Sequence, residues 1–204
     1  MKKILIILII SLVFVLPVMA DDFDDDFDDD FDFYSYSSVN TGYGAIIQDG
    51  KLINTIDVGF SYNFASLNDF RTLGIGLGSR FDALFGVGNK TPKNYIDCSF
   101  LLGPFFHIVI NRAIALNLTA GPLFGFYKDG NTRDDEHFTI GPAIDASITL
   151  KPQSFNSISF SFGTLAAVNF GFASEPVMYS VVPYVSFNMV FSNSYIPYNS
   201  LIIY

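Results

Sequence analysis

From residue 37 onward the sequence alternates between large apolar side chains and small or polar ones, with a period of two. In 51–64 one set of alternate residues is mostly large and apolar: Leu52, Asn54, Ile56, Val58, Phe60, Tyr62 and Phe64. The set between them is mostly small or polar: Lys51, Ile53, Thr55, Asp57, Gly59, Ser61 and Asn63. Successive side chains of a β-strand point to opposite faces, so this segment is predicted to be a strand with one apolar and one polar side.

The alternation recurs along most of the chain and predicts an all-β fold. It predicts eight strands, at 37–48, 51–64, 72–85, 95–110, 114–127, 137–150, 157–172 and 179–191. Each is long enough to cross a bilayer when tilted, which takes roughly 9–11 residues. Asp49-Gly50 is a two-residue hairpin signal that pairs Ile47 with Leu52. The turn 111–113 pairs Ile110 with Ile114.

The polar face consists mostly of Gly, Ser, Thr and Asn, which suits the narrow lumen of a small barrel. A soluble lipocalin-like barrel, the alternative, would carry Lys, Glu and Arg outside and bury its apolar face. Large aromatic side chains near the strand ends suit the interfacial girdles of a membrane barrel. We therefore predict an antiparallel eight-stranded transmembrane β-barrel at 37–191. The segment 192–204 is an extension or a further strand, which would allow ten strands.

The N-terminal segment predicts export. Lys2 and Lys3 precede an apolar run at 4–16, and Val18-Met19-Ala20 resembles a small-residue cleavage site. We expect a signal peptide at 1–20 that is cleaved after Ala20. The alternative, a retained membrane helix, is disfavoured because the run is shorter than the ~20 residues of a span.

An acidic stretch, DDFDDDFDDDFDF, begins at Asp21. Its nine aspartates repel one another and its apolar content is low, so we expect a disordered tail at 21–36. A docking motif or a weak divalent-cation site is the alternative. Beyond this tail the chain is almost neutral, with nine basic and eleven acidic residues. No basic face is present for a nucleic-acid partner.

Three Gly-Pro pairs, at 103–104, 121–122 and 141–142, fall inside predicted strands, and Pro183 falls in the last one. Each proline removes a donor from the ladder, so we expect β-bulges at these places. All four prolines lie on the apolar face, so the alternation continues through them.

Several ionisable residues fall on the polar face and are predicted to lie in the lumen. The expected charge network consists of Asp57, Arg80, Asp82, Asp97 and Asp145, with His107 and Tyr184 on the same face. A buried charge needs a partner, and Arg80 is expected to pair foremost with Asp57 and Asp97, with Asp82 two residues on. A side-chain plug is favoured over an ion or solute path, because eight strands leave little free bore.

A signal-type segment followed by alternating strands, the last carrying Val185, Phe187, Met189 and Phe191, resembles the small outer-membrane barrels of the OmpX, OmpW and OmpA-transmembrane-domain type. The resemblance covers 37–191. It implies the outer membrane of a diderm bacterium and an aromatic assembly signal, at Phe191 or Tyr204, for the barrel-assembly machinery. An even number of strands places both ends of the barrel on the periplasmic side, so the loops 49–50, 86–94, 128–136 and 173–177 are expected to face outward. We expect contact with outer-membrane lipid, and with an extracellular or host ligand at these loops.

No catalytic, cofactor-binding or metal-binding set of residues is predicted. His107 and His137 are expected at opposite rims, and no serine or cysteine nucleophile stands beside either of them with an orienting carboxylate. Two functions remain open: a structural or surface-interaction barrel with a plugged lumen, and a narrow channel for a small or hydrophobic solute. A lipid-modifying enzyme is a lesser alternative that the resemblance leaves open.

Overall fold

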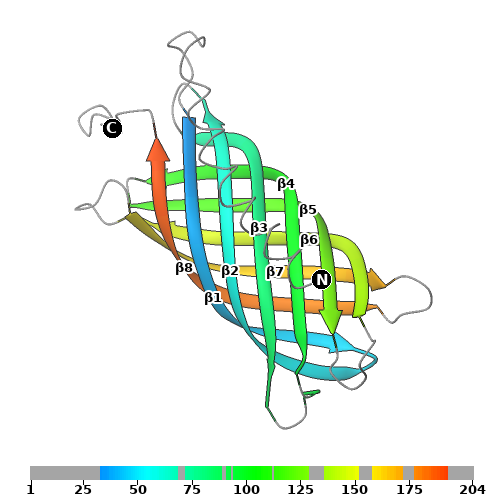
Figure 1. Cartoon of the computed structure of the whole chain (residues 1–204). Helices are drawn as coiled ribbons and strands as arrows, with labels where there is room; N and C mark the ends of the chain where they lie inside the picture. Colours follow the sequence, from blue (N-terminus) through cyan, green and yellow to red (C-terminus); the bar gives the residue numbers. More distant parts are fainter. Residues whose placement is uncertain are drawn as a thin grey trace, which may run out of the picture. The chain divides into compact units, whose positions relative to one another are not determined.

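The computed structural model describes residues 33–68, 72–88, 91–92, 94–111, 113–128, 136–151, 158–171 and 177–192. These residues form the strands β1 (Phe33–Gln48), β2 (Lys51–Leu67), β3 (Leu73–Val87), β4 (Ile96–Asn111), β5 (Ile114–Lys128), β6 (Glu136–Leu150), β7 (Ile158–Gly171) and β8 (Met178–Ser192). Each strand pairs antiparallel with its neighbours in the chain, and β8 pairs with β1 (Figure 1). The described strands therefore close into an eight-stranded barrel, as predicted.

The strand bounds differ from the predicted ones by a few residues. The largest difference is at β1, which begins at Phe33 rather than at 37. Tyr34 and Tyr36 continue the inward alternation there and are buried in a cluster with Phe105. The predicted signal peptide and most of the acidic tail, at 1–32, lie outside the described residues, as does 193–204 with Tyr204.

The hairpin between β1 and β2 has the predicted register. Ile47 pairs with Leu52 and Gln48 with Lys51, around Asp49 and Gly50, whose φ angles are 51° and 70°. These left-handed angles match the twist of the flanking strands, which is why Asp-Gly is favoured there. The end of the barrel that carries this hairpin is called the hairpin end below, and the end where β1 begins and β8 finishes is called the terminal end.

The turn between β4 and β5 differs from the prediction by one residue. Asn111, not Ile110, pairs with Ile114, and the register shifts between Val109 and Asn111. The reason is local, because Asn111 Oδ1 accepts hydrogen bonds from the backbone N–H groups of Ala113 and Ile114, both at 2.9 Å. An asparagine side chain that caps its own turn in this way tightens it.

The expected bulges at the prolines are absent from the described strands, and that prediction is wrong. Between β4 and β5 the pairing passes from Leu101–Leu123 to Phe105–Thr119 without a change of register, although the pairs between are interrupted. Glycine explains how the strands remain aligned. A Cβ added to Gly103 would lie 2.0 Å from the carbonyl oxygen of Ala120, so only glycine admits this approach.

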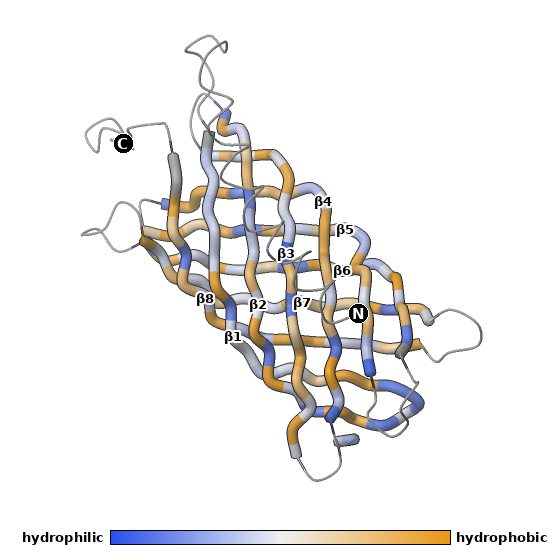
Figure 2. Tube along the Cα trace, in the orientation of Figure 1, coloured by the Kyte–Doolittle hydropathy of each residue, from blue (hydrophilic) through white to orange (hydrophobic). Residues whose placement is uncertain are grey.

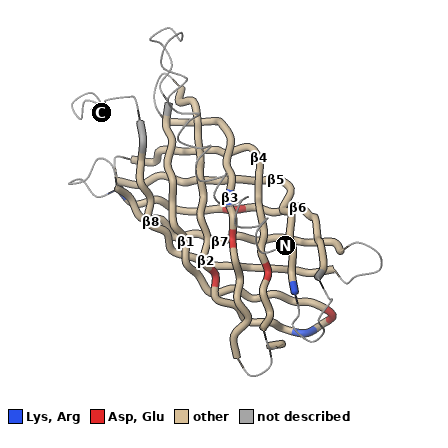
Figure 3. The backbone as a smooth tube through the Cα atoms, viewed as in Figure 1, with Lys and Arg blue, Asp and Glu red and all other residues tan. Residues whose placement is uncertain are grey.

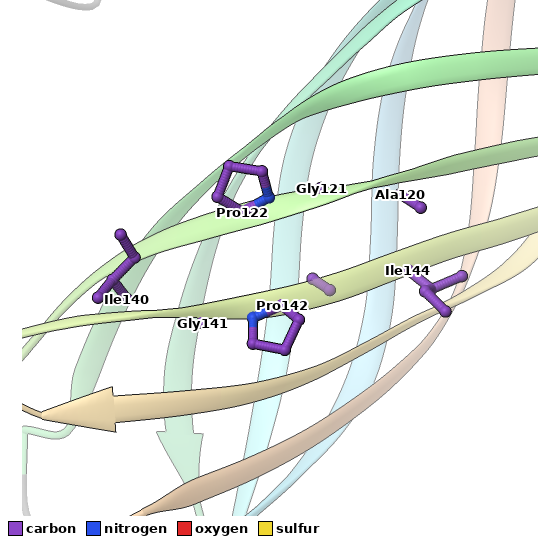
Figure 4. A pocket seen from close by; sticks show the side chains of 8 residues that line it. Ala120, Gly121, Pro122, Ile140, Gly141, Pro142 and Ile144 are labelled. Atoms are coloured by element: carbon purple, nitrogen blue, oxygen red, sulfur yellow. The ribbon is translucent and has the colours of Figure 1, made fainter.

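The prolines point outward from the barrel. Pro122 and Pro142 pair directly with each other, on the outside of β5 and β6 (Figure 4). They line a shallow outer hollow of about 480 Å³ whose other lining residues are Ala120, Gly121, Ile140, Gly141, Ala143 and Ile144.

The outer face of the barrel is apolar and exposed, and the inner face is buried. Apolar and polar residues alternate along the strands in Figure 2, and charged residues of the strands are few in Figure 3. Leu77 and Phe162 are each 55 % exposed, in the company of some thirty other large apolar side chains. A soluble lipocalin-like barrel would bury this face, so the lipid-facing interpretation is favoured.

In the described part of the chain, no helix is both long enough and apolar enough to cross a membrane.

Candidate functional site

A buried charged cluster occupies the middle of the lumen, centred on Arg80 of β3. Its Nε donates to both carboxylate oxygens of Asp82, at 2.8 and 2.9 Å, and its Nη2 donates to Asp82 Oδ1 at 2.8 Å. Residues two apart on a strand share a face, which brings these two side chains together. Short charge-assisted bonds of this kind are stronger than hydrogen bonds between neutral groups.

Three further strands contribute to the cluster. Arg80 Nη2 donates to Asp57 Oδ2 of β2 at 3.3 Å, and Nη1 donates to Asp145 Oδ2 of β6 at 3.3 Å. Tyr184 of β8 donates its hydroxyl to Asp145 Oδ1 at 2.6 Å, and its ring centre lies 3.9 Å from the guanidinium carbon of Arg80. These five residues, Arg80, Asp57, Asp82, Asp145 and Tyr184, are called the Arg80 cluster below.

The sequence predicted most of the members of this cluster but not its contacts. Asp97, expected as a foremost partner, is buried on β4 beside Leu84 and Tyr127, whereas the ion pairs of Arg80 among the described residues go to the other three aspartates. Asp145 reaches Arg80 across the lumen from a distant strand. A glycine in the sequence marks the position of Tyr184. A Cβ on Gly163 would lie 2.4 Å from the ring of Tyr184, so the lack of a side chain at residue 163 leaves room for that ring.

The lumen towards the hairpin end is apolar, which the sequence analysis missed. The buried cluster there consists of Ile46, Ile53, Leu84, Tyr95, Leu101, Leu123, Tyr127, Ala143, Leu165, Ala167, Met178 and Val182. Next to the hairpin, at the mouth of the barrel, Gln48 Nε2 donates to the Tyr127 hydroxyl at 2.9 Å. Gln48 lies on β1 and Tyr127 on β5, four strands away in the ring of eight, so this bond spans the mouth of the barrel.

Towards the terminal end the lumen is filled by a belt of hydrogen-bonded polar side chains. His107 Nδ1 donates to Asn117 Oδ1 at 2.6 Å, and Asn117 Nδ2 donates to Thr149 Oγ1 at 2.6 Å. The belt continues through Ser161, 2.7 Å from Thr149, to Asn188, whose Nδ2 donates to the Ser161 hydroxyl at 2.7 Å. Five consecutive strands, β4 to β8, are therefore linked by side chains as well as by their backbones.

Aromatic side chains and a lysine cover the terminal end of this belt. Tyr34 stacks on His107 with ring centres 4.1 Å apart, and Lys151 Nζ lies 4.7 Å from the centre of the Tyr34 ring. Lys151 follows the end of β6, and burial lowers the pKa of its ammonium group to about 8.

The described residues offer little for catalysis. His107 lies in the belt at the terminal end, whereas His137 stacks on Tyr127 at the hairpin end, with ring centres 4.7 Å apart. The two histidines therefore belong to different sites. No group of three or more His, Cys, Asp or Glu within the described ranges is placed to hold a metal ion.

Comparison with known proteins supports the fold. No family model and no curated protein matches the chain. Among solved structures, Neisserial surface protein A has a TM-score of 0.59 at 10 % identity, over 78 % of this chain and 97 % of that one. Ail of Yersinia pestis, in complex with the heparin analogue sucrose octasulfate, has a TM-score of 0.45 at 11 % identity, over 78 % and 99 %. The outer membrane enzyme PagL has 0.49 at 14 %, over 74 % and 98 %.

At these identities the likeness concerns the fold. The predicted resemblance to the class of small outer-membrane barrels is confirmed, and the chain has the architecture of a general outer-membrane β-barrel protein.

Proposed function

We propose that this protein is a non-conducting barrel of the bacterial outer membrane that presents its loops to a partner outside the cell. The observation that supports this most is the filling of the lumen by three sets of buried side chains. The apolar cluster, the Arg80 cluster and the polar belt each place buried side chains across the lumen. An eight-stranded barrel is narrow enough for side chains to fill it.

The buried apolar cluster at the hairpin end argues against an ion path. A permeating ion would have to lose its water among buried side chains, beside Leu101, Leu123 and Leu165 and past Arg80, the cross-strand partner of Leu101. Removing an ion from water is costly unless buried groups replace its hydration, and the charged groups of the Arg80 cluster already bond to one another, so this filling is a barrier. The protein is therefore proposed to act through its surface rather than through its lumen.

The loops at the hairpin end suit a polar partner. The connection between β5 and β6 carries Asp129, Arg133, Asp134 and Asp135. Loops held by a rigid sheet are the common place for binding residues. An extracellular or host ligand with polar and charged groups is the partner we propose, and catalysis is not part of the proposal.

Planar-bilayer recording tests the proposal. We expect the wild-type barrel, refolded in detergent and added to the bilayer, to give no current above that of the bare membrane. The positive control is a triple variant, Leu101→Ser, Leu123→Ser and Leu165→Ser, which makes the apolar cluster polar. Reproducible current steps from the wild type would overturn the plug in favour of the channel.

A further inference from the structure

The Arg80 cluster contains more negative than positive groups. Three carboxyl groups face one guanidinium, and Asp97 adds a fourth buried carboxyl group to the lumen. If all were ionised, the site would hold an excess of negative charge away from water, and each unpaired ion would carry a large desolvation cost. A proton is the smallest ligand that removes such a charge.

The hydrogen bonds show which aspartates have donors for both oxygens of an ionised carboxylate. Both oxygens of Asp82 accept short bonds from Arg80. Asp145 accepts from Arg80 at one oxygen and from the Tyr184 hydroxyl at the other, and it is 13 % exposed. Each therefore has donors for the two oxygens of a carboxylate.

Asp57 is different. Its Oδ2 has a single long contact with Arg80 Nη2, at 3.3 Å. Its Oδ1 is buried without any hydrogen-bond partner, and the side chain is 0 % exposed. An ionised carboxylate with a bare oxygen in a dry site loses its hydration without replacement.

A neutral carboxylic acid fits this position. Protonation removes the charge and gives Asp57 an O–H donor that a carboxylate lacks. An acceptor is close, because the same Nη2 that contacts Asp57 Oδ2 at 3.3 Å also contacts Asp82 Oδ1 at 2.8 Å. The titratable groups around this position are Arg80 and Asp82 on β3, Asp97 on β4, Asp145 on β6, Tyr184 on β8 and Tyr36 on β1.

We infer that Asp57 is a proton-binding site in the lumen: a neutral carboxylic acid that takes one proton from water on folding and shares it with the Asp82 carboxylate. This inference rests on the Arg80 cluster and not on the proposed loop partner. The folded chain then holds one more proton than the unfolded chain at neutral pH. Its stability therefore falls as the pH rises.

The test compares Asp57→Asn with the wild type by urea unfolding in micelles between pH 6 and pH 9. Asparagine has the shape of the neutral acid and keeps a donor. We expect the folded-to-unfolded ratio of the wild type, divided by that of the variant, to fall by up to tenfold per pH unit. Lys151, whose pKa is lowered to about 8, makes the stability rise with pH above that value. Both proteins contain Lys151, so its contribution cancels from the ratio.

Asp82→Asn is the matched control, because it removes the carboxylate that holds Arg80. We expect it to lower the folded-to-unfolded ratio at every pH, by more than Asp57→Asn does at pH 7. If Asp57→Asn is as damaging as Asp82→Asn, or leaves the pH slope unchanged, Asp57 is an anion and the inference is wrong. Should Asp57→Asn not fold, infrared spectra of the Asp97→Asn variant with labelled aspartate decide, because Asp97 is the other buried aspartate that could give the same band. A protonated carboxyl band at pH 7 supports the inference, and its absence overturns it.

Discussion

Replacing Arg80 by alanine is expected to lower the free energy of unfolding by about 3–5 kcal/mol, the usual effect of leaving buried charges without their partner. Arg80 is 2 % exposed and contacts the carboxyl groups of Asp57, Asp82 and Asp145. Without the guanidinium, these carboxyl groups face one another in a dry site. Urea unfolding in detergent micelles, followed by circular dichroism, measures the loss.

A double-mutant cycle separates the ion pair from general damage. Asp82 is the partner to use, because it makes the short bonds to Arg80. We expect the double change Arg80→Ala with Asp82→Ala to cost less than the sum of the single changes. Arg80→Lys should fall between wild type and alanine, since lysine keeps the charge but not the two-pronged geometry. Stability that is unchanged in Arg80→Ala, together with a new current, would indicate a hydrated path instead of a plug.

The second large effect is expected on the outer face. Leu77→Arg and Phe162→Arg should each destabilise the barrel by about 2–4 kcal/mol in lipid, because both place a cation near the middle of the hydrocarbon layer. Leu52 is the matched control. It is 53 % exposed, close to the 55 % of Leu77, but it adjoins the Asp49-Gly50 hairpin at the rim.

Leu52→Arg should therefore cost only about 0–1 kcal/mol, as for charges near the interface. Reversible folding into lipid vesicles, with denaturant titration, gives all three values. Equal costs at the three positions would mean that depth in a bilayer does not matter, and that the exposed apolar face has another explanation.

The fold could be predicted from sequence because a period of two determines which face each side chain occupies. The Asp49-Gly50 hairpin also fixes the register of β1 against β2. The unpredicted details depend on local hydrogen bonds and on close backbone contacts at glycines, and alternation reports neither. They include the turn at Asn111 and the unbulged strands at Pro104 and Pro122.

The interior of the lumen was harder to predict than its wall. Alternation placed Asp97 and Asp145 on the inner face, but it could not show that Asp145 meets Arg80 and Asp97 does not. Contacts across a lumen depend on the stagger of distant strands, which no single segment encodes. The apolar cluster was missed for a related reason: Ile53 stands alone among polar residues in its own segment, whereas in the structure it lies with Leu84 and Leu101 at the hairpin end.

The most direct test of a filled lumen is thiol accessibility at buried serines. Ser161 and Ser186 face the lumen, and a cysteine at either position changes one atom of the side chain. With Cys98 replaced by alanine, the barrel bearing Ser161→Cys or Ser186→Cys is folded into vesicles and treated with a charged, water-soluble thiol reagent. We expect the folded protein to stay unmodified and the urea-unfolded protein to react completely. Rapid modification of the folded barrel at both positions would show water in the lumen and would contradict the plug.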